Sequence, residues 1–197
     1  DVWAPFTADH LLGTDQLGRD LLSRLIYGAR LTIGIALATT LVSFTIGIAL
    51  GFTAAVVGGW LDQLLSRAVD ALMAIPTLIF ALLVLTVLGT SIPVLILVIA
   101  ALDSTRVFRL ARSLAVNIAA QDFVEVARLR GERLPWILVR ELLPNALPTL
   151  VAEFGLRFCF VFLFIAALSF LGLGVQPPNA DWGGMVRENA PAINFGM

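Results

Sequence analysis

The sequence contains no lysine, because all thirteen basic residues among its 197 are arginines. A P-loop phosphate site and a Schiff-base site both need a lysine, so this chain carries neither. It has one cysteine, Cys159, and one histidine, His10. A lone cysteine excludes an internal disulfide and a paired-cysteine metal site, so we expect Cys159 to serve packing. A single histidine likewise does not make a metal site.

Charge of either sign is also scarce. Charged residues make up 14% of the chain and hydrophobic residues 59%, against about 25% and 45–50% in soluble domains. No charge occurs in the 31 residues between Arg30 and Asp62 or in the 32 between Asp70 and Asp103. Crossing a bilayer takes about 20 helical residues. The composition therefore predicts an all-α, polytopic transmembrane helical bundle.

Four membrane spans are expected. The first uncharged run forms one span, and the sequence GTSIP at residues 89–93 divides the second run into two. The fourth extends from about Asn145 to Val175. Gly47 and Gly51 have the spacing that lets helices approach closely, and Pro76 is expected to kink its span. Because the chain starts without methionine and stops at INFGM, we expect a fragment that lacks the first and last spans.

Arginine is concentrated in one segment, which sets the expected orientation. Residues 103–141 hold seven arginines and five acidic residues, a net charge of 7 − 5 = +2, and cytoplasmic loops are enriched in such residues. We therefore expect a cytoplasmic loop 103–144 within a transmembrane core 31–175. Residues 59–70 then form a second cytoplasmic loop. Residues 1–30, 89–92 and 176–197 are expected outside, the last as a loop leading to a missing span.

Two smaller features carry predictions. Asp20 is placed to cap a helix with apolar residues at helical spacing, which predicts an amphipathic helix on the outer membrane surface and leaves contact with an external partner open. Glu153 and Arg157 lie four residues apart within the fourth span, so they share a helix face and are able to pair. An unpaired charge there costs at least about 2.5–3.5 kcal/mol. Pairing for structure and a role in gating or in a pathway through the bundle both remain open.

The charged interruption DFVEVARLRGERLPWILVRELLPNALP, residues 122–148, predicts a short helix bracketed by its own signals. Asp122 and Glu125 match an acidic capping box, and Gly131 is suited to a helix C-terminus. The nine or so residues place Phe123, Val124 and Ala127 on one side, and charged residues on the other.

A second helix is expected to follow this first one. Pro135 suits its first position, Leu143 and Pro144 are expected to end it, and Asn145 to cap the next span. The segment is therefore predicted to be a helix-turn-helix between two spans. It acts either as an arginine-rich connector that sets topology or as a docking helix for a cytoplasmic partner.

The spacing of Glu125, Ala127, Gly131, Leu143 and Pro144 resembles the Glu-Ala-Ala loop of ABC-importer permeases. Val126 stands where that family usually has alanine, and Glu141 where its peptide-transport branch often has histidine. Two further stretches resemble the external segments of the dipeptide, oligopeptide and nickel branch: LGTDQLGRDLLSRLIYGAR at 12–30 and SFLGLGVQPPNADWGGMVREN at 169–189.

The resemblance implies a type I permease fold in the bacterial cytoplasmic (inner) membrane, crossing it several times in contact with lipid. It implies a second permease subunit, two cytoplasmic ATPases and an external solute-binding protein as partners, and no nucleic acid. ATP and magnesium then belong to the ATPases, so this chain needs no catalytic residue or cofactor. Asp122 and the matched loop residues would couple the permease to an ATPase.

The expected cargo is a di- or oligopeptide, with nickel or another small solute as the alternative. A secondary transporter or channel is a further alternative, although the broken, charged helices and repeats of that class do not stand out. An intramembrane enzyme is disfavoured, because the sequence shows no nucleophile–base pair.

Overall fold

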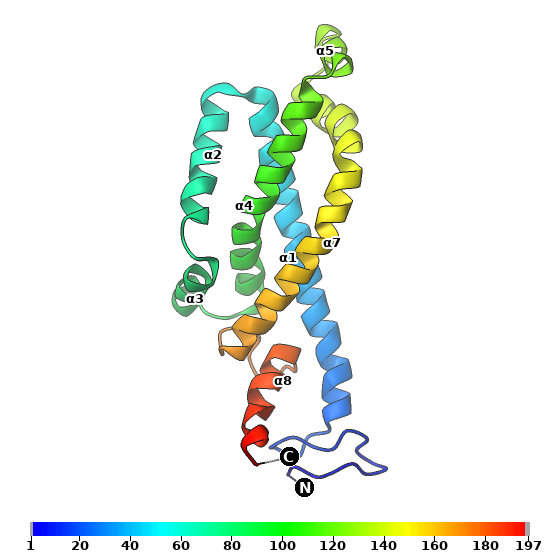
Figure 1. Cartoon of the computed structure of the whole chain (residues 1–197), viewed down its shortest axis with the longest axis vertical. Coiled ribbons are helices and arrows are strands. Elements are labelled where there is room, and N and C mark those ends of the chain that lie inside the picture. The colour runs from blue at the N-terminus through cyan, green and yellow to red at the C-terminus, as the bar shows by residue number, and fades with distance from the viewer. Residues whose placement is uncertain (1, 196–197) are drawn as a thin grey trace. The chain divides into compact units, whose positions relative to one another are not determined.

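The computed structural model describes residues 2–195, with side chains through Ala192. All its regular elements are helices, and the only bridge among these residues joins Thr14 to Asp20 (Figure 1). The helices are α1 (Leu21–Val57), α2 (Gly59–Met73), α3 (Thr77–Leu88), α4 (Ile92–Ala119), α5 (Asp122–Leu129), α6 (Leu134–Trp136), η1 (Ile137–Leu142), α7 (Leu143–Phe170), α8 (Trp182–Asn189) and η2 (Ala190–Phe195). The predicted all-α class is confirmed.

The contacts divide the chain into two compact units. Unit 1 comprises Asp1–Ala38, Leu82–Ile96 and Phe160–Met197. Unit 2 comprises Thr39–Ala81 and Leu97–Cys159. Helices α1, α3, α4 and α7 have residues in both units, and each contact described below joins residues of one unit.

Within residues 2–195, two helices are long and apolar enough to cross a membrane: α1 and the continuous helix Leu134–Phe170. The pair α2 and α3 becomes a third candidate if its 88° bend lies within one span. The third predicted span, which follows residues 89–93, corresponds to α4, which is 28 residues long but carries four charged residues from Asp103 to Arg112. Apolar composition and length thus support two or three of the four expected spans.

The predicted outer-surface helix is wrong as a separate element. Asp20 does cap a helix, since Ser23 N donates to its Oδ2 at 2.7 Å, but that helix is α1 and it continues for 37 residues. Nothing between Leu21 and Val57 breaks it, because the segment has no proline and its two charged residues, Arg24 and Arg30, are compatible with a helix. At about 1.5 Å per residue α1 is about 55 Å long, well beyond a hydrocarbon core of about 30 Å.

The expected loop 59–70 is also helical, as α2. This helix ends at Met73 and the next begins at Thr77, so Pro76 marks a complete break of 88° rather than a kink. Proline lacks the N–H that a continuing helix needs and disfavours helical geometry in the residue before it. Arg112 forms an ion pair with Asp62, and Arg109 Nη2 lies 2.5 Å from Asp70 Oδ1. These two predicted cytoplasmic segments therefore lie side by side.

Close approach of α1 and α4 in unit 2 depends on the predicted glycine pair. A Cβ at Gly47 would lie 2.6 Å from Val107 Cβ, and one at Gly51 would lie 2.8 Å from Phe108 O. Real Cβ atoms do not approach backbone so closely, so both positions need glycine. The prediction that Gly47 and Gly51 serve helix packing is confirmed.

Candidate functional site

Helix α5 begins one residue differently from the prediction. Gln121 is its N-cap, with extended backbone, and no side chain makes a capping hydrogen bond. Asp122 is instead the first helical residue, so the acidic capping box is wrong. Asp122 and Glu125 still lie in the first turn, where negative charge complements the partial positive charge of a helix N-terminus.

Gly131 ends α5 as predicted. Its φ is +79°, a conformation that costs side-chain-bearing residues about 1–2 kcal/mol. Gly131 N donates to Arg128 O at 2.9 Å, and Glu132 N donates to Ala127 O at 3.2 Å. These two bonds constitute a Schellman motif, which satisfies the last carbonyl groups and turns the chain away from the helix axis.

One face of α5 is fixed to the rest of unit 2. Val124 and Ala127 are fully buried. Val124 belongs to a hydrophobic cluster drawn from α1, α4, η1 and α7, whose other buried members are Phe52, Ala111, Ala115, Ile137, Leu142, Ala146 and Leu150. Eight residues are too few to hold a helix in water, so this packing is what maintains α5.

The other face of α5 is exposed and partly apolar. Phe123 is 40% exposed, Val126 51% and Leu129 81%. Glu125 and Arg128 lie exposed among them, and the Glu125 side chain has no hydrogen-bond or ion-pair partner within the described part of the chain. The predicted division of the helix is therefore right for Val124 and Ala127 but wrong for Phe123.

The predicted helix-turn-helix is wrong beyond Gly131. Leu134 begins a helix that continues through η1 into α7 without a break at Leu143 and Pro144. Pro135 occupies its second position rather than its first. The helix accommodates Pro144 because η1 is a π-helix, in which Leu143 N bonds to Leu138 O.

Asn145 therefore caps no new helix. Its Nδ2 donates to Glu141 O at 2.6 Å within the continuous helix. Of the Leu-Pro pair, Leu143 packs against the cluster beneath α5, whereas Pro144 is exposed. The structure thus brings Val124 and Leu143 together on one cluster, and Ala127 is buried separately on the same helix.

Arg130 links the end of α5 to the following helix. Its guanidinium carbon lies 5.6 Å from the centre of the Trp136 ring, and Nη2 lies 4.0 Å from Glu141 Oε1. Glu141, a departure from the family pattern, thus faces an arginine. Contacts of this kind contribute about 0.5–1 kcal/mol each at exposed sites.

The predicted pair Glu153–Arg157 is present and belongs to a larger group. Arg157 Nε lies 2.6 Å from Glu153 Oε1, and its Nη1 lies 3.7 Å from Asp103 Oδ1. Ser43 Oγ donates to Asp103 Oδ2 at 2.8 Å. Asp103 is 4% exposed, so α1, α4 and α7 surround a buried carboxylate. Sequence spacing identified the i,i+4 pair but not Ser43 or Asp103.

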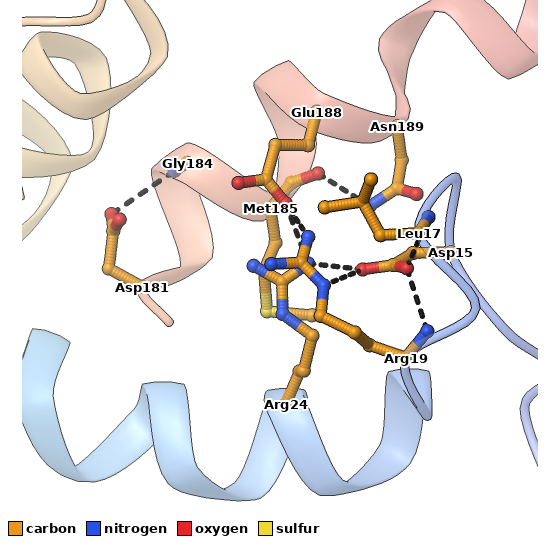
Figure 2. Close-up of polar contacts among 9 residues, drawn as sticks. All are labelled: Asp15, Leu17, Arg19, Arg24, Asp181, Gly184, Met185, Glu188 and Asn189. Carbon is orange, nitrogen blue, oxygen red and sulfur yellow. Dashed lines mark hydrogen bonds and ion pairs between the residues drawn. The ribbon is translucent and has the colours of Figure 1, made fainter. Parts of the chain in front are cut away.

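A second charged cluster joins the two predicted external segments in unit 1. Figure 2 shows Arg19 and Arg24 between the carboxylates of Asp15 and Glu188. Each arginine lies 2.7 Å from Asp15 Oδ2 and 2.6 Å from Glu188 Oε2. Residues 12–30 and 169–189 are therefore in contact within unit 1, and their external location stays a prediction.

Asp15 anchors the turn before α1. Its Oδ1 accepts hydrogen bonds from Leu17 N at 2.8 Å and Arg19 N at 2.9 Å. Burial raises the pKa of the Asp15 carboxyl, but these bonds and the Arg19 guanidinium outweigh burial and hold that pKa below its usual range. The carboxylate is ionised at neutral pH.

The single histidine and the single cysteine of the sequence lie in different environments. His10 Nδ1 lies 3.1 Å from Asp20 Oδ1, beside the start of α1. Cys159 is exposed on α7, so the expectation that it packs in the interior of this chain is wrong. Its apolar sequence surroundings match an exposed apolar helix surface equally well.

Comparison with known proteins identifies the family. A model described as the binding-protein-dependent transport system inner membrane component matches residues 47–196, a range that includes α5 and residues 169–189 but not residues 12–30. The chain belongs to this family. The resemblance inferred from the loop spacing is confirmed, as is the permease fold.

Relatives within the family are named for different transported solutes. The chain is 33% identical over 95% of its length to the dipeptide transport system permease protein DppC of Alkalihalophilus pseudofirmus. It is 38% identical over 92% to the di/tripeptide transport system permease protein DppC of Pseudomonas aeruginosa, and 36% identical over 92% to the nickel transport system permease protein NikC of Escherichia coli K12. The chain spans 62%, 60% and 65% of these relatives' lengths.

Proposed function

We propose that this chain is the permease subunit of an ATP-driven importer for di- or oligopeptides in the bacterial inner membrane. Family membership supports the permease role, and two of the three relatives described above are named for peptides. The third is named for nickel, so nickel or another small solute is the alternative cargo. Uptake driven by an ion gradient alone would instead indicate a secondary transporter.

We further propose that α5 is the coupling helix that docks on a cytoplasmic ATPase. The observation that carries this role is the division of α5 between an anchored face and an exposed one. Val124 and Ala127 are fully buried, while Val126 and Leu129 are 51% and 81% exposed. An exposed apolar patch with charged neighbours is typical of a protein interface, and the burial beneath it supplies a rigid attachment.

Each motif residue then has a role. Asp122 and Glu125 flank the docking face at its N-terminal end, and Ala127 lies fully buried on the anchored face of the helix. Gly131 ends the helix, and Leu143 with Pro144 continues the chain into the span beneath it. ATP and magnesium would be held by the ATPases, with a second permease and an external binding protein completing the assembly.

The mechanism follows from this attachment. Closure of two ATPases around ATP changes the position of the groove that holds α5, and the buried contacts of α5 transmit that displacement into unit 2. A ligand shifts a conformational equilibrium only through contacts that differ between the two states. The exposed face of α5 supplies that differential contact, whereas Arg157 with Glu153 and Asp103 is proposed to preserve the helix arrangement that moves with it.

The test replaces exposed apolar residues of α5 and measures the complete transporter in proteoliposomes. Leu129→Ser and Val126→Ser should lower both ATPase binding and ATP-dependent uptake, because each removes apolar area from the interface. Val186→Ser is the matched control, since Val186 is 61% exposed on α8, in the predicted external segment. Normal uptake and ATPase binding by both α5 variants would refute the docking role.

Cargo is tested separately with the same vesicles. Uptake of a radiolabelled dipeptide that requires ATP and the external binding protein supports the peptide assignment. Uptake of nickel without dipeptide uptake assigns the alternative cargo, and uptake of either without ATP contradicts the importer assignment.

A further inference from the structure

A groove of about 450 Å³ in unit 1 has no part in the proposed coupling. One face of α1 forms its floor, with Tyr27, Arg30, Leu31, Gly34 and Ile35 at successive helical spacings. Ile96 of α4 and residues 179–180, just before α8, form its walls. The groove is therefore mostly apolar, with one positive charge and two further polar groups.

The wall beside α8 is held firmly against α1. Trp182 Nε1 donates to Leu25 O at 2.9 Å, and Trp182 N donates to Thr32 Oγ1 at 3.2 Å. A Cβ at Gly28 would lie 3.4 Å from Ala180 O and 3.3 Å from Trp182 Cδ1, so Gly28 permits this approach. These hydrogen bonds and this close contact therefore hold the α8 wall of the groove in a fixed position against α1.

Gly34 leaves the floor of the groove open. It is helical, and a Cβ added there would meet no atom within 4 Å. No close packing therefore requires glycine at this position, in contrast to Gly47 and Gly51, where a Cβ would lie under 3.0 Å from neighbouring atoms. A larger side chain at residue 34 would occupy the groove without displacing protein atoms.

Arg30 supplies an uncompensated charge. Within the described residues it forms no ion pair, whereas Arg19 and Arg24, earlier in the same region, each contact two carboxylates. Tyr27 beside it is 75% exposed. An arginine and a tyrosine at the end of a long apolar helix are typical of the level of lipid headgroups.

The residues around the groove indicate which kind of anionic ligand it is suited to bind. Ile33 and Leu37, neighbours of the groove residues on α1, are each 42% exposed. Exposed apolar residues beside the groove favour hydrocarbon over water as its environment. A ligand suited to this groove has an anionic head at Arg30 and an apolar chain toward Gly34, Ile35 and Ile96.

We propose that the groove binds one membrane phospholipid. Its phosphate accepts hydrogen bonds from Arg30, with Tyr27 at headgroup level, and one acyl chain lies over Gly34 between Ile35 and Ile96. The proposal requires only that the chain lies in a membrane, so it stands or fails independently of coupling to an ATPase. A bound lipid there would fix the α8 wall against the start of α1.

The experiment titrates phosphatidylglycerol into the delipidated, full-length complex and counts bound lipid by native mass spectrometry. Arg30→Gln should weaken retention about fivefold, the effect of one arginine near a lipid surface, and Arg30→Lys should restore most of it. Gly34→Leu should displace the chain and remove the bound lipid. Arg67→Gln and Gly155→Leu are matched controls, because Arg67 is exposed on α2 and Gly155 also has no neighbour within 4 Å of its Cβ.

Each other outcome contradicts the proposal. Equal lipid retention by all variants would show that the groove holds no lipid. Unchanged retention together with a raised KM for dipeptide uptake in Arg30→Gln and Gly34→Leu would assign the groove to the solute instead. Thermal unfolding of Arg30→Gln and Gly34→Leu, compared with the unchanged complex, checks that the test variants fold.

Discussion

Replacing Gly131 by alanine tests how the end of α5 controls coupling. The residue has a φ of +79°, and its added Cβ would meet nothing within 4 Å. The cost is therefore conformational rather than steric, about 1–2 kcal/mol for an L-residue in the left-handed region. That amount is about a 5–30-fold change in the ratio of ordered to disordered states, and α5 has only eight residues.

The expected result is faster amide hydrogen exchange at residues 122–132 and fewer solute molecules transported per ATP hydrolysed. The measurement uses hydrogen exchange on the purified complex and paired uptake and ATPase assays in proteoliposomes. Gly131→Asn should lose less, since asparagine tolerates the left-handed conformation better than alanine does. Gly155→Ala in α7 is the control, because alanine in a helix interior is favoured by about 0.5–1 kcal/mol.

Equal exchange at residues 122–132 in Gly131→Ala and Gly155→Ala would refute the structural part of this reasoning. Increased exchange with an unchanged transport-to-ATP ratio would refute the coupling part, since it would show that an ordered α5 terminus is not needed.

Three further predictions concern packing, buried charge and pH. Gly51→Val should lower the melting temperature of the complex, because the valine Cβ would lie 2.8 Å from Phe108 O and overpacking costs about 1–3 kcal/mol. An unchanged melting temperature would contradict the close contact between α1 and α4. Arg157→Gln should lower the free energy of unfolding by up to about 3 kcal/mol, because it removes one of two guanidinium groups near the buried Asp103 and leaves that carboxylate with Ser43 and with Arg106 at 3.8 Å. Adding Asp103→Asn should recover part of that loss in denaturant unfolding. The pKa of the Asp15 carboxyl lies below its usual value of 3.8, so the stability that this carboxylate contributes should be present at neutral pH and lost only as pH falls below that value. Residues 12–20 should then become more sensitive to protease. A gain in protease sensitivity already at pH 6 would contradict this assignment.

Features that depend on residues close together in the sequence were the ones that could be predicted from it. The Gly131 terminus, the small-residue spacing of Gly47 and Gly51, a bend at Pro76 and the Glu153–Arg157 pair are all signalled by residues within four positions of one another, although the bend is a complete break rather than the predicted kink. Their energies are dominated by backbone conformation and by i,i+4 proximity, which the sequence displays directly.

The errors arise where distant residues decide the outcome. Pro144 was expected to end a helix, but a π-helical turn stabilised by packing on the unit 2 cluster carries the chain through it. Ser43 and Asp103 are 60 residues apart, so no spacing rule places one beside the other. Arg24 and Glu188 are separated by 164 residues and meet only because the two external segments fold together.

The proposed docking of α5 is tested most directly by site-specific cross-linking. With Cys159 replaced by serine, single cysteines are introduced at Leu129, which is 81% exposed on α5, and at Tyr27, which is 75% exposed on α1. In the assembled transporter, a short bifunctional maleimide should join Leu129→Cys to the ATPase subunit, with a yield that changes when ATP is bound, and should leave Tyr27→Cys unlinked. Cross-linking of Tyr27→Cys to the ATPase, or none at Leu129→Cys in an active transporter, would contradict the proposed coupling helix.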